Sequence, residues 1–434
     1  MKAFLPLYLL VGLVLLLVAW AQLARLRPVW FWYLTGYPVI ALRVVRTWRK
    51  VAQLNDLCVT PNPARRLLGD LIVRGESLRS VPPCISFPKP TRTGLSVVVR
   101  LHPGQTPAPF VAAADALAHA WRVHAVRVTS PERGTVQLLA TAGDPLENPG
   151  VAHAPAALLC ALVGILESGA AWVMDLRKVP HWLITGATQS GKSNLLARLV
   201  VQLAPQDVAL VGIDCKGGME LGLFGPRLTV LATSRREAVA VLGAVVDEMH
   251  DRMKLCREAG VRAVWELPDK VRPVPVVVIA DEIAELYFSD GTRASKAEAE
   301  QCSTFLLRIA QLGAVLDVHL VVAAQRFGSE LGPGVTALRA QLSGRICHRV
   351  NDSGTAEMTL GDLNKDAVAV AQSITADEKG VAICTGADGA WSRGRSHKTT
   401  TEEARLITLK HADRTPALPG IQRAHLLAEG GAGS

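Results

Sequence analysis

The stretch HWLITGATQSGKSN, residues 181–194, decides the fold expected for this chain. It contains Gly-x-x-x-x-Gly-Lys-Ser from Gly186 to Ser193, with an apolar segment before it and the helically spaced apolar residues of SNLLARLVVQLA after it. The glycines and the start of a helix expose backbone N–H groups that can surround phosphates. The pattern therefore predicts a strand, a phosphate-binding loop and a helix. We expect nucleotide contacts from Gly186, Ala187, Thr188, Gln189, Ser190, Gly191, Lys192, Ser193 and Asn194.

An apolar segment that ends in two acids indicates what the nucleotide is used for. The segment VVVIADE ends in Asp281 and Glu282, and in a parallel sheet its carboxyl end would lie beside the loop. Asp281 and Ser193 would hold Mg²⁺, and Glu282 would deprotonate the attacking water. Lys192 would reach the β- and γ-phosphates of ATP. GTPases and kinases carry the same loop, but the acidic pair favours ATP hydrolysis; an ordinary acidic turn is the alternative.

Three further residues could complete a catalytic site. Gln325 ends the segment VHLVVAAQ, where an amide can sense the γ-phosphate; a surface amide is the alternative. ATPases that work as rings take an arginine from the neighbouring subunit to stabilise charge in the transition state. Arg308 and Arg345 are the candidates for this role, and an ordinary surface position is the alternative for each.

Strand and helix patterns alternate from residue 156 to residue 400, as in an α/β domain with a parallel sheet. DVALVGID, RLTVLAT, VPVVVIADE and VHLVVAAQR have the pattern of strands, and Ser234 is expected to cap a long helix. GRICHRV and KGVAICTG are expected as short strands at the sheet edge. The predicted fold class is α/β, a RecA-like P-loop NTPase motor domain over residues 156–400, followed by a C-terminal helix and tail over 401–434.

A smaller module precedes the motor domain. Residues 51–155 begin with a polar, proline-containing connector. Between residues 94 and 142, three strand patterns accompany one amphipathic helix, with a turn at 132–134. The pattern predicts a small α/β domain.

The first 50 residues have the composition of a membrane anchor. Residues 4–24 carry no charge over 21 positions, enough at 1.5 Å per residue to cross a ~30 Å hydrocarbon layer, so we expect a transmembrane helix. Residues 28–45 form a second apolar stretch, interrupted by Gly36 and Pro38, which predicts an interfacial segment or a tilted second helix. A cleavable signal peptide is the alternative, because residues 19–21 have the form of a cleavage site.

Charge predicts the orientation of this anchor. Residues 1–50 contain seven Lys or Arg and no acid, so they account for +7 of the net charge of +9. Basic residues collect on the cytoplasmic side of membrane segments, where anionic lipid lies. The predicted location is the cytoplasmic membrane, with the motor domain in the cytoplasm.

The eight cysteines are scattered along the chain without a C-x-x-C pair. This distribution favours free thiols in a reducing compartment over a disulfide framework or a zinc site.

Several stretches together resemble the FtsK/SpoIIIE family of hexameric DNA translocases. DLRKVPHWLITGATQSGKSN resembles the family's segment through the phosphate-binding loop, and GIDCKGGMELGLF resembles its Asp-x-Lys stretch. EMHDRMKLCREAGVR is similar to the family's Glu-Met-x-x-Arg helix, here with Glu248, Met249 and Arg252. VVVIADEIAEL and the stretch from RIAQ to VHLVVAAQR extend a resemblance that covers about residues 170–400.

The resemblance implies a membrane-tethered homo-oligomer, a hexameric ring that uses ATP to move double-stranded DNA through its pore. A chain with one or two membrane segments resembles most the plasmid-transfer branch of mycelial actinobacteria, which implies conjugal transfer of plasmid or chromosomal DNA between cells or compartments. Lys216 and Arg326 are candidate DNA contacts. About 45 residues follow ICTG, too few for the family's DNA-reading winged-helix domain, so a separate DNA-loading protein is a further candidate partner.

Two other functions fit parts of the sequence. Protein-secretion systems use related motor ATPases, although these usually repeat the domain and only one phosphate-binding loop occurs here. A membrane scaffold could bind ATP without processive movement. The presence of Lys192, Asp281, Glu282 and Gln325 in one chain argues against the scaffold.

Overall fold

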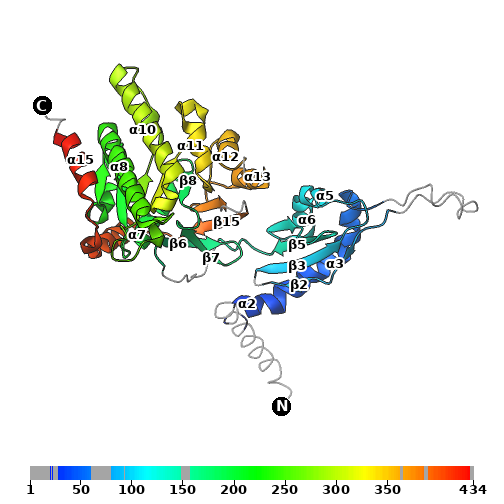
Figure 1. Ribbon diagram of the computed structural model, residues 1–434. Helices are drawn as coiled ribbons and strands as arrows, with labels where there is room; N and C mark the ends of the chain where they lie inside the picture. The colour runs from blue at the N-terminus through cyan, green and yellow to red at the C-terminus, as the bar shows by residue number, and fades with distance from the viewer. Residues whose placement is uncertain are drawn as a thin grey trace, which may run out of the picture. The chain divides into compact units, whose positions relative to one another are not determined.

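The computed structural model divides the chain into two compact units, one that ends at Asn148 and one that begins at Pro149 (Figure 1). The described residues are Trp20, Gln22, 28–59, 80–91, 93–147, 157–361, 365–385 and 390–430. All eight cysteines lie within these ranges, as free thiols.

The first unit is built on an antiparallel sheet with the strand order β1-β3-β5-β4, and β2 pairs with β3. The strands are β1 Cys84–Ile85, β2 Lys89–Pro90, β3 Gly94–Arg100, β4 Ala125–Thr129 and β5 Thr135–Thr141. Alternate residues of β3, namely Leu95, Val97 and Val99, are buried, as in a strand with one face on a core. The predicted single helix is divided into α5 Ala108–Ala112 and α6 Ala114–Trp121.

A helical run precedes this sheet. It consists of α2 Pro28–Phe31, the π-helical segment η2 Trp32–Gly36 and α3 Tyr37–Leu54. One face of α3 shares a hydrophobic core with β3 and β5, through Ile40, Ala41, Val44, Trp48, Val51 and Ala52. The domain boundary expected at residue 50 therefore falls inside a helix of the first unit. Sequence reasoning placed the start of the folded unit too late, because the first half of this helix is apolar on both faces and resembles a membrane segment.

The described residues contain no helix that is both long enough and apolar enough to cross a membrane. The transmembrane helix expected at residues 4–24 lies outside the described residues, apart from Trp20 and Gln22. Of the second expected segment, residues 28–45, the structure describes helix, and the part from Ile40 onward packs on the sheet.

The second unit contains a ten-stranded sheet with the order β10-β9-β11-β12-β8-β13-β14-β15-β6-β7. The first six strands of this order are parallel, and the other four pair antiparallel. The strands are β6 Cys160–Leu166, β7 Ala171–Asp175, β8 His181–Thr185, β9 Ala209–Ile213, β10 Val230–Ala232, β11 Val276–Ala280, β12 Val318–Ala324, β13 Gly344–His348, β14 Val381–Thr385 and β15 Trp391–Ser396. This is an α/β fold with a parallel sheet around β8, as predicted.

Helices cover both faces of this sheet. They are α7 Lys192–Leu203, α8 Arg235–Ala259, α9 Ala284–Tyr287, α10 Arg293–Leu312, α11 Val335–Gln341, α12 Ser353–Leu360, α13 Lys365–Ser373, α14 Thr401–Lys410 and α15 Pro419–Gly430. Alternate residues of β11 point to opposite cores: Val276 and Val278 join the core with α8 and α10, which pack side by side (Figure 1), and Val277 and Ile279 join the core with α7. Burial on both faces explains why these strands appear in the sequence as continuous apolar runs.

The two segments expected at the sheet edge lie in its interior. GRICHRV supplies β13, between β8 and β14, and KGVAICTG supplies β14. Three further strands, β15, β6 and β7, extend the sheet beyond them. Sequence reasoning missed this extension because β6 and β7 precede the phosphate-binding loop in the chain and join the sheet only through β15.

Helix α8 confirms the predicted cap and shows the contacts of Arg252, the arginine of the Glu-Met-x-x-Arg stretch. Ser234 Oγ accepts a hydrogen bond from the Glu237 N–H at 3.3 Å. Arg252 is 2% exposed; its guanidinium binds Glu248 Oε1 at 2.9 Å and donates to the backbone oxygens of Leu316 and Val274 at 3.0 and 2.8 Å. Arg252 therefore ties α8 to the segments that lead into β12 and β11.

Replacing Arg252 with Met is expected to lower the free energy of unfolding of this unit by about 3 kcal/mol, because buried carbonyl groups lose their donors. Urea denaturation followed by tryptophan fluorescence measures the change. The control is Arg257→Met, because Arg257 lies on the same helix and is exposed. Equal midpoints for the two variants would contradict the structural role of Arg252.

Candidate functional site

The phosphate-binding loop joins β8 to α7 at the carboxyl end of the parallel strands, as predicted. β8 lies between β12 and β13, and the loop is held from both sides. Gly186 N–H donates to the Ala324 carbonyl at 3.2 Å, and Ala187 N–H donates to the Arg349 carbonyl at 2.9 Å. Gln189 has φ 62° and Gly191 has φ +116°. Such left-handed residues are typical of loops whose successive N–H groups form an anion-binding nest.

A residue far along the chain fixes the tip of this loop. Gly380, just before β14, donates its N–H to the Ser190 carbonyl at 2.9 Å. A Cβ atom on Gly191 would lie 2.6 Å from the Gly380 Cα. The loop and the β14 strand end therefore approach each other through two glycines, and Gly191 has no room for a side chain.

Asn194 connects the first turn of α7 to the segment after β15. Its Nδ2 donates to the His397 carbonyl at 2.9 Å and to Ser396 Oγ at 3.1 Å, and its Oδ1 accepts from the Thr399 N–H at 2.8 Å. The sequence assigned Asn194 to the nucleotide. Asn194 lines the pocket, and its amide also holds the backbone that forms the far wall of the site.

A buried histidine lies beneath the loop. His348, in β13, is fully buried, and its Nδ1 hydrogen-bonds with the Val381 carbonyl at 3.0 Å. Burial and, to a smaller extent, the nearby Lys192 ammonium lower the pKa of His348 to about 4, although the hydrogen bond with the Val381 carbonyl opposes this shift. The imidazole is therefore neutral near pH 7 and adds no second positive charge beneath Lys192.

The two acids after β11 meet the loop lysine, as the sequence predicted. Lys192 Nζ lies 3.3 Å from the backbone oxygen of Asp281 and 3.4 Å from Glu282 Oε2. Lys192, Asp281 and Glu282 are all less than 9% exposed. Burial raises the pKa of Asp281, and the ammonium groups of Lys192 and Lys216 oppose that rise. Asp281 Oδ1 has no hydrogen-bond partner among the residues that the structure describes, which leaves it available to a metal-bound water.

Gln325 also reaches the site. It follows β12 directly; its side chain lines the pocket, and its N–H donates to Glu282 Oε1 at 3.3 Å. Its neighbour Arg326, a candidate DNA contact, is half-exposed and pairs with Glu330 at 2.7 Å.

The two arginines proposed to act on a neighbouring subunit occupy different environments. Arg308 is exposed on α10 and does not line the pocket of its own chain. Arg345 is 3% exposed, and its guanidinium donates to the backbone oxygens of Leu342, Thr359 and Arg339. These contacts give Arg345 a structural role inside β13, so Arg308 remains the candidate. The sequence could not separate the two, because burial of β13 depends on the strands that extend the sheet.

Lys216 lies in the ATPase site, contrary to its expected role as a DNA contact. Its Nζ is 3.5 Å from Glu282 Oε2 and 4.0 Å from Asp281 Oδ2. The loop that carries Lys216 is held by Asp214, whose carboxylate accepts from the N–H groups of Lys216, Glu220 and Leu221 at 3.3, 2.8 and 3.0 Å. Glu282 thus lies between two ammonium groups, those of Lys192 and Lys216.

Replacing Lys216 with Met is expected to lower kcat for ATP hydrolysis about tenfold or more, because the Glu282 carboxylate loses one of the two cations that orient it. ATP affinity is expected to change much less, and Lys216→Arg should restore part of the rate. Steady-state hydrolysis and equilibrium binding of a fluorescent ATP analogue measure the two effects. The control is Lys254→Met, which removes an exposed ammonium on α8. An unchanged kcat for Lys216→Met would contradict this role.

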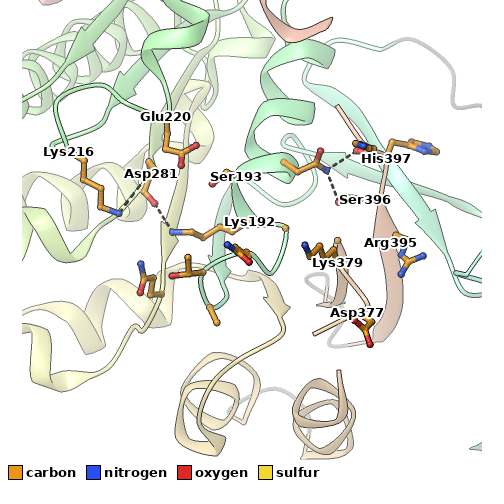
Figure 2. Close-up of a pocket in the computed structure, with 18 residues that line it drawn as sticks. Lys192, Ser193, Lys216, Glu220, Asp281, Asp377, Lys379, Arg395, Ser396 and His397 are labelled. Atoms are coloured by element: carbon orange, nitrogen blue, oxygen red, sulfur yellow. Dashed lines mark hydrogen bonds and ion pairs between the residues drawn. The ribbon is translucent and has the colours of Figure 1, made fainter. Parts of the chain in front are cut away.

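These residues surround a pocket of about 940 Å³, at the upper end of the ~300–1,000 Å³ typical of small-molecule sites. Figure 2 shows Lys192 directed toward Asp281 on one side of the loop, with Lys379 and Arg395 on the other. The residues fit a Mg²⁺–nucleotide: the loop provides N–H groups, Ser190 Oγ is buried without a partner among the described residues, and Asp281 Oδ1 is likewise unpaired. Ser193 lines the pocket near Asp281, where the sequence placed the metal.

Sequence reasoning missed the wall of the pocket that the C-terminal strands supply. This wall consists of Asp377, Lys379, Gly380, Arg395, Ser396, His397 and Lys398. Basic residues predominate in it, which suits the phosphates and polar edges of a nucleotide. The basic and polar segment RSHKTT, residues 395–400, was a local signal for such a wall. Nothing local indicates that this segment folds onto residues two hundred positions earlier in the chain.

Comparisons with known proteins support the same interpretation of the site. Residues 148–329 match the FtsK/SpoIIIE family, and residues 18–142 match the N-terminal domain of actinomycete conjugal transfer proteins. The chain is 40% identical over 392 residues to the transfer protein TraSA of Streptomyces ambofaciens, covering 88% of this chain and 94% of the relative.

A DNA translocase is more distantly similar in sequence, and a solved coupling-protein structure is similar in fold. The DNA translocase FtsK of Caldanaerobacter subterraneus is 34% identical over 189 residues, which is 41% of this chain and 25% of that protein. Among solved structures, the pCW3 conjugation coupling protein TcpA, in its monomer form with ATPγS, aligns with a TM-score of 0.56. That alignment covers 75% of this chain and 92% of TcpA at 20% identity, so it supports the fold alone.

Proposed function

We propose, from the premise that this chain belongs to the FtsK/SpoIIIE family, that it is an ATPase which moves double-stranded DNA during conjugal transfer. Its N-terminal part belongs to the domain of actinomycete conjugal transfer proteins, and a transfer protein of Streptomyces is similar to it over nearly the whole of both chains. The similarity of the second unit to DNA translocases supports DNA as the substrate.

The observation that carries the ATPase assignment is the placement of Glu282. Its carboxylate is buried at the carboxyl end of β11, where it contacts Lys192 and the Gln325 N–H, two residues that line the pocket containing the phosphate-binding loop. A site that only bound nucleotide would need the loop and the lysine but no buried carboxylate beside them, because an unneeded buried charge is costly. Hydrolysis requires a group that can accept a proton from water at this position.

Each residue then has a defined task. The loop N–H groups and Lys192 bind and orient the phosphates, and Ser193 and Asp281 hold Mg²⁺, directly and through water. Mg²⁺, when bound, neutralises charge on the phosphates. Glu282 orients the attacking water and accepts its proton, while Lys216 and the Gln325 N–H fix the position of the carboxylate.

We propose that copies of the chain form a ring, a hexamer by analogy with the family, and that each site is completed by Arg308 of the neighbouring copy. The exposure of Arg308 on α10 supports this role, because an arginine that acts on a neighbouring copy must lie at the surface of its own chain. A central pore would then contact the phosphates of the duplex.

We also propose that residues 4–24 anchor the chain in the cytoplasmic membrane as a single span, with the motor in the cytoplasm. The support is the uncharged run of 21 residues and the concentration of seven basic residues, without an acid, in the first 50 positions.

The test is ATP hydrolysis by the full chain in lipid vesicles with no nucleic acid, with single-stranded DNA and with linear duplex DNA. Strong stimulation by the duplex, absent in Glu282→Gln, is the expected result. Hydrolysis that is indifferent to DNA would contradict translocation and favour a protein-secretion ATPase. No hydrolysis under any condition would contradict the enzymatic assignment itself.

A further inference from the structure

The helical run of the first unit is apolar on its outer face as well as on its inner face. Trp30 and Leu34 are 61% and 63% exposed, and Val39, Leu42 and Val45 are each about half-exposed. The opposite side of α3 already fills the core of the unit. A helix at the surface of a soluble domain normally presents polar residues to water. We name these five residues the outer apolar face.

A loop of the sheet extends this face. Phe87 is 73% exposed, and the residues after it are held against the start of α3. Tyr37 Oη donates to the Pro88 carbonyl at 2.8 Å, and Trp32 Nε1 donates to the Thr91 carbonyl at 3.0 Å. Two segments that are fifty residues apart in the sequence therefore present apolar side chains at the same end of the unit.

Exposed basic residues follow the outer apolar face on the same helix. Arg46, Arg49 and Lys50 are exposed on the turns that follow the outer apolar face. No acid occurs in residues 28–54 or in residues 80–91. Apolar and aromatic side chains followed by a band of basic residues are typical of a surface that rests on an anionic bilayer. Trp30 and Tyr33, whose ring centroids are 6.5 Å apart, are residues that favour the membrane–water interface.

We propose that the folded first unit itself docks on an anionic lipid bilayer, with the outer apolar face and Phe87 in the interface and Arg46, Arg49 and Lys50 at the lipid headgroups. This inference rests on the proposed membrane anchor and adds a second, folded attachment to it. A bilayer is favoured over a second copy of the chain for two reasons. The face lies only a few residues after the uncharged run 4–24, and a symmetric contact between two copies would bring basic bands of the same sign together.

Site-specific photocrosslinking of the full chain tests the proposal. Leu34 and Phe87 are replaced one at a time by the photoreactive amino acid p-benzoylphenylalanine, and each variant is reconstituted in vesicles of phosphatidylglycerol and phosphatidylcholine. The matched control is the same replacement at Leu54, which ends the same helix and is 73% exposed, beyond the basic band. After illumination, lipid adducts are quantified by mass spectrometry.

Lipid adducts at Leu34 and Phe87 that exceed those at Leu54 by about tenfold or more are the expected result, with weaker adducts when phosphatidylglycerol is left out. Crosslinks from Leu34 or Phe87 to another copy of the chain would overturn the proposal and identify a subunit contact. Equal adducts at all three positions, or none, would also overturn it. Flotation of the variants with the vesicles tests the membrane anchor, and their duplex-stimulated ATP hydrolysis tests the motor. Failure of the docking proposal can therefore be distinguished from failure of the proposed function.

Discussion

Replacement of Glu282 by Gln is expected to lower kcat for ATP hydrolysis by about 10²- to 10⁴-fold, the range typical for loss of a general base. The amide has the same shape and can still accept the Gln325 N–H that now binds the carboxylate at 3.3 Å. It cannot take a proton from water, and it no longer forms ion pairs with Lys192 and Lys216. ATP binding should therefore persist while turnover stops.

Single-turnover hydrolysis and equilibrium binding of a fluorescent ATP analogue separate these two effects. The control is Glu285→Gln, because Glu285 lies one turn further along, on α9, and does not line the pocket. Normal turnover in Glu282→Gln would contradict its role as the base. It would then direct attention to Glu220, a carboxylate that lines the pocket.

Replacement of Gly191 by Ala is expected to weaken ATP binding about 10²-fold, as follows from about 3 kcal/mol of distortion in the loop. Two effects add. Gly191 has φ +116°, where an L side chain is strained. In addition, its Cβ would lie 2.6 Å from the Cα and 2.7 Å from the N of Gly380, and backbone atoms cannot move aside as a side chain can.

Isothermal titration of the full chain with ATPγS measures this loss. Gly420→Ala is the matched control: Gly420 has no positive φ, and a Cβ there would meet nothing within 4 Å. The control separates the effect of the loop from a general effect of removing a glycine. Affinity in Gly191→Ala within a few-fold of the original chain would show that the loop and the β14 strand end can move apart without cost.

How well the sequence predicts a feature depends on the range of the interactions that form it. Lys192, Asp281, Glu282 and Gln325 lie together where the sequence predicted them, and their roles stay predictions. Asp281, Glu282 and Gln325 follow apolar runs that form buried strands, and Lys192 begins the helix after such a strand. Parallel strands bring their carboxyl ends to one edge of the sheet, so the placement of these four residues follows from local pattern plus one topological rule.

Arg345, Lys216 and Asn194 make contacts that such reasoning did not predict. Each was assigned by residue type, as a trans-acting arginine, a DNA contact and a nucleotide ligand. Their actual partners are backbone oxygens inside the chain for Arg345, the two catalytic acids for Lys216, and the segment after β15 for Asn194. The acids that contact Lys216 are at least 65 residues away, the carbonyl that binds Asn194 is 203 residues away, and one of the Arg345 partners is 14 residues away. The local pattern does not specify these contacts.

The sequence by itself predicted the strand, loop and helix of the nucleotide site, the two acids at the end of β11, the parallel strands around them and the apolar character of the N-terminal region. These properties depend on short-range spacing and on the chemistry of single residues. Only the tertiary structure decided that β13 and β14 are interior strands and that the backbone of Gly380 leaves no room for a side chain at Gly191. It also decided that the helix after residue 28 belongs to a folded unit. Each of these depends on contacts between distant segments, because close packing of a core selects partners by shape and burial rather than by position in the sequence.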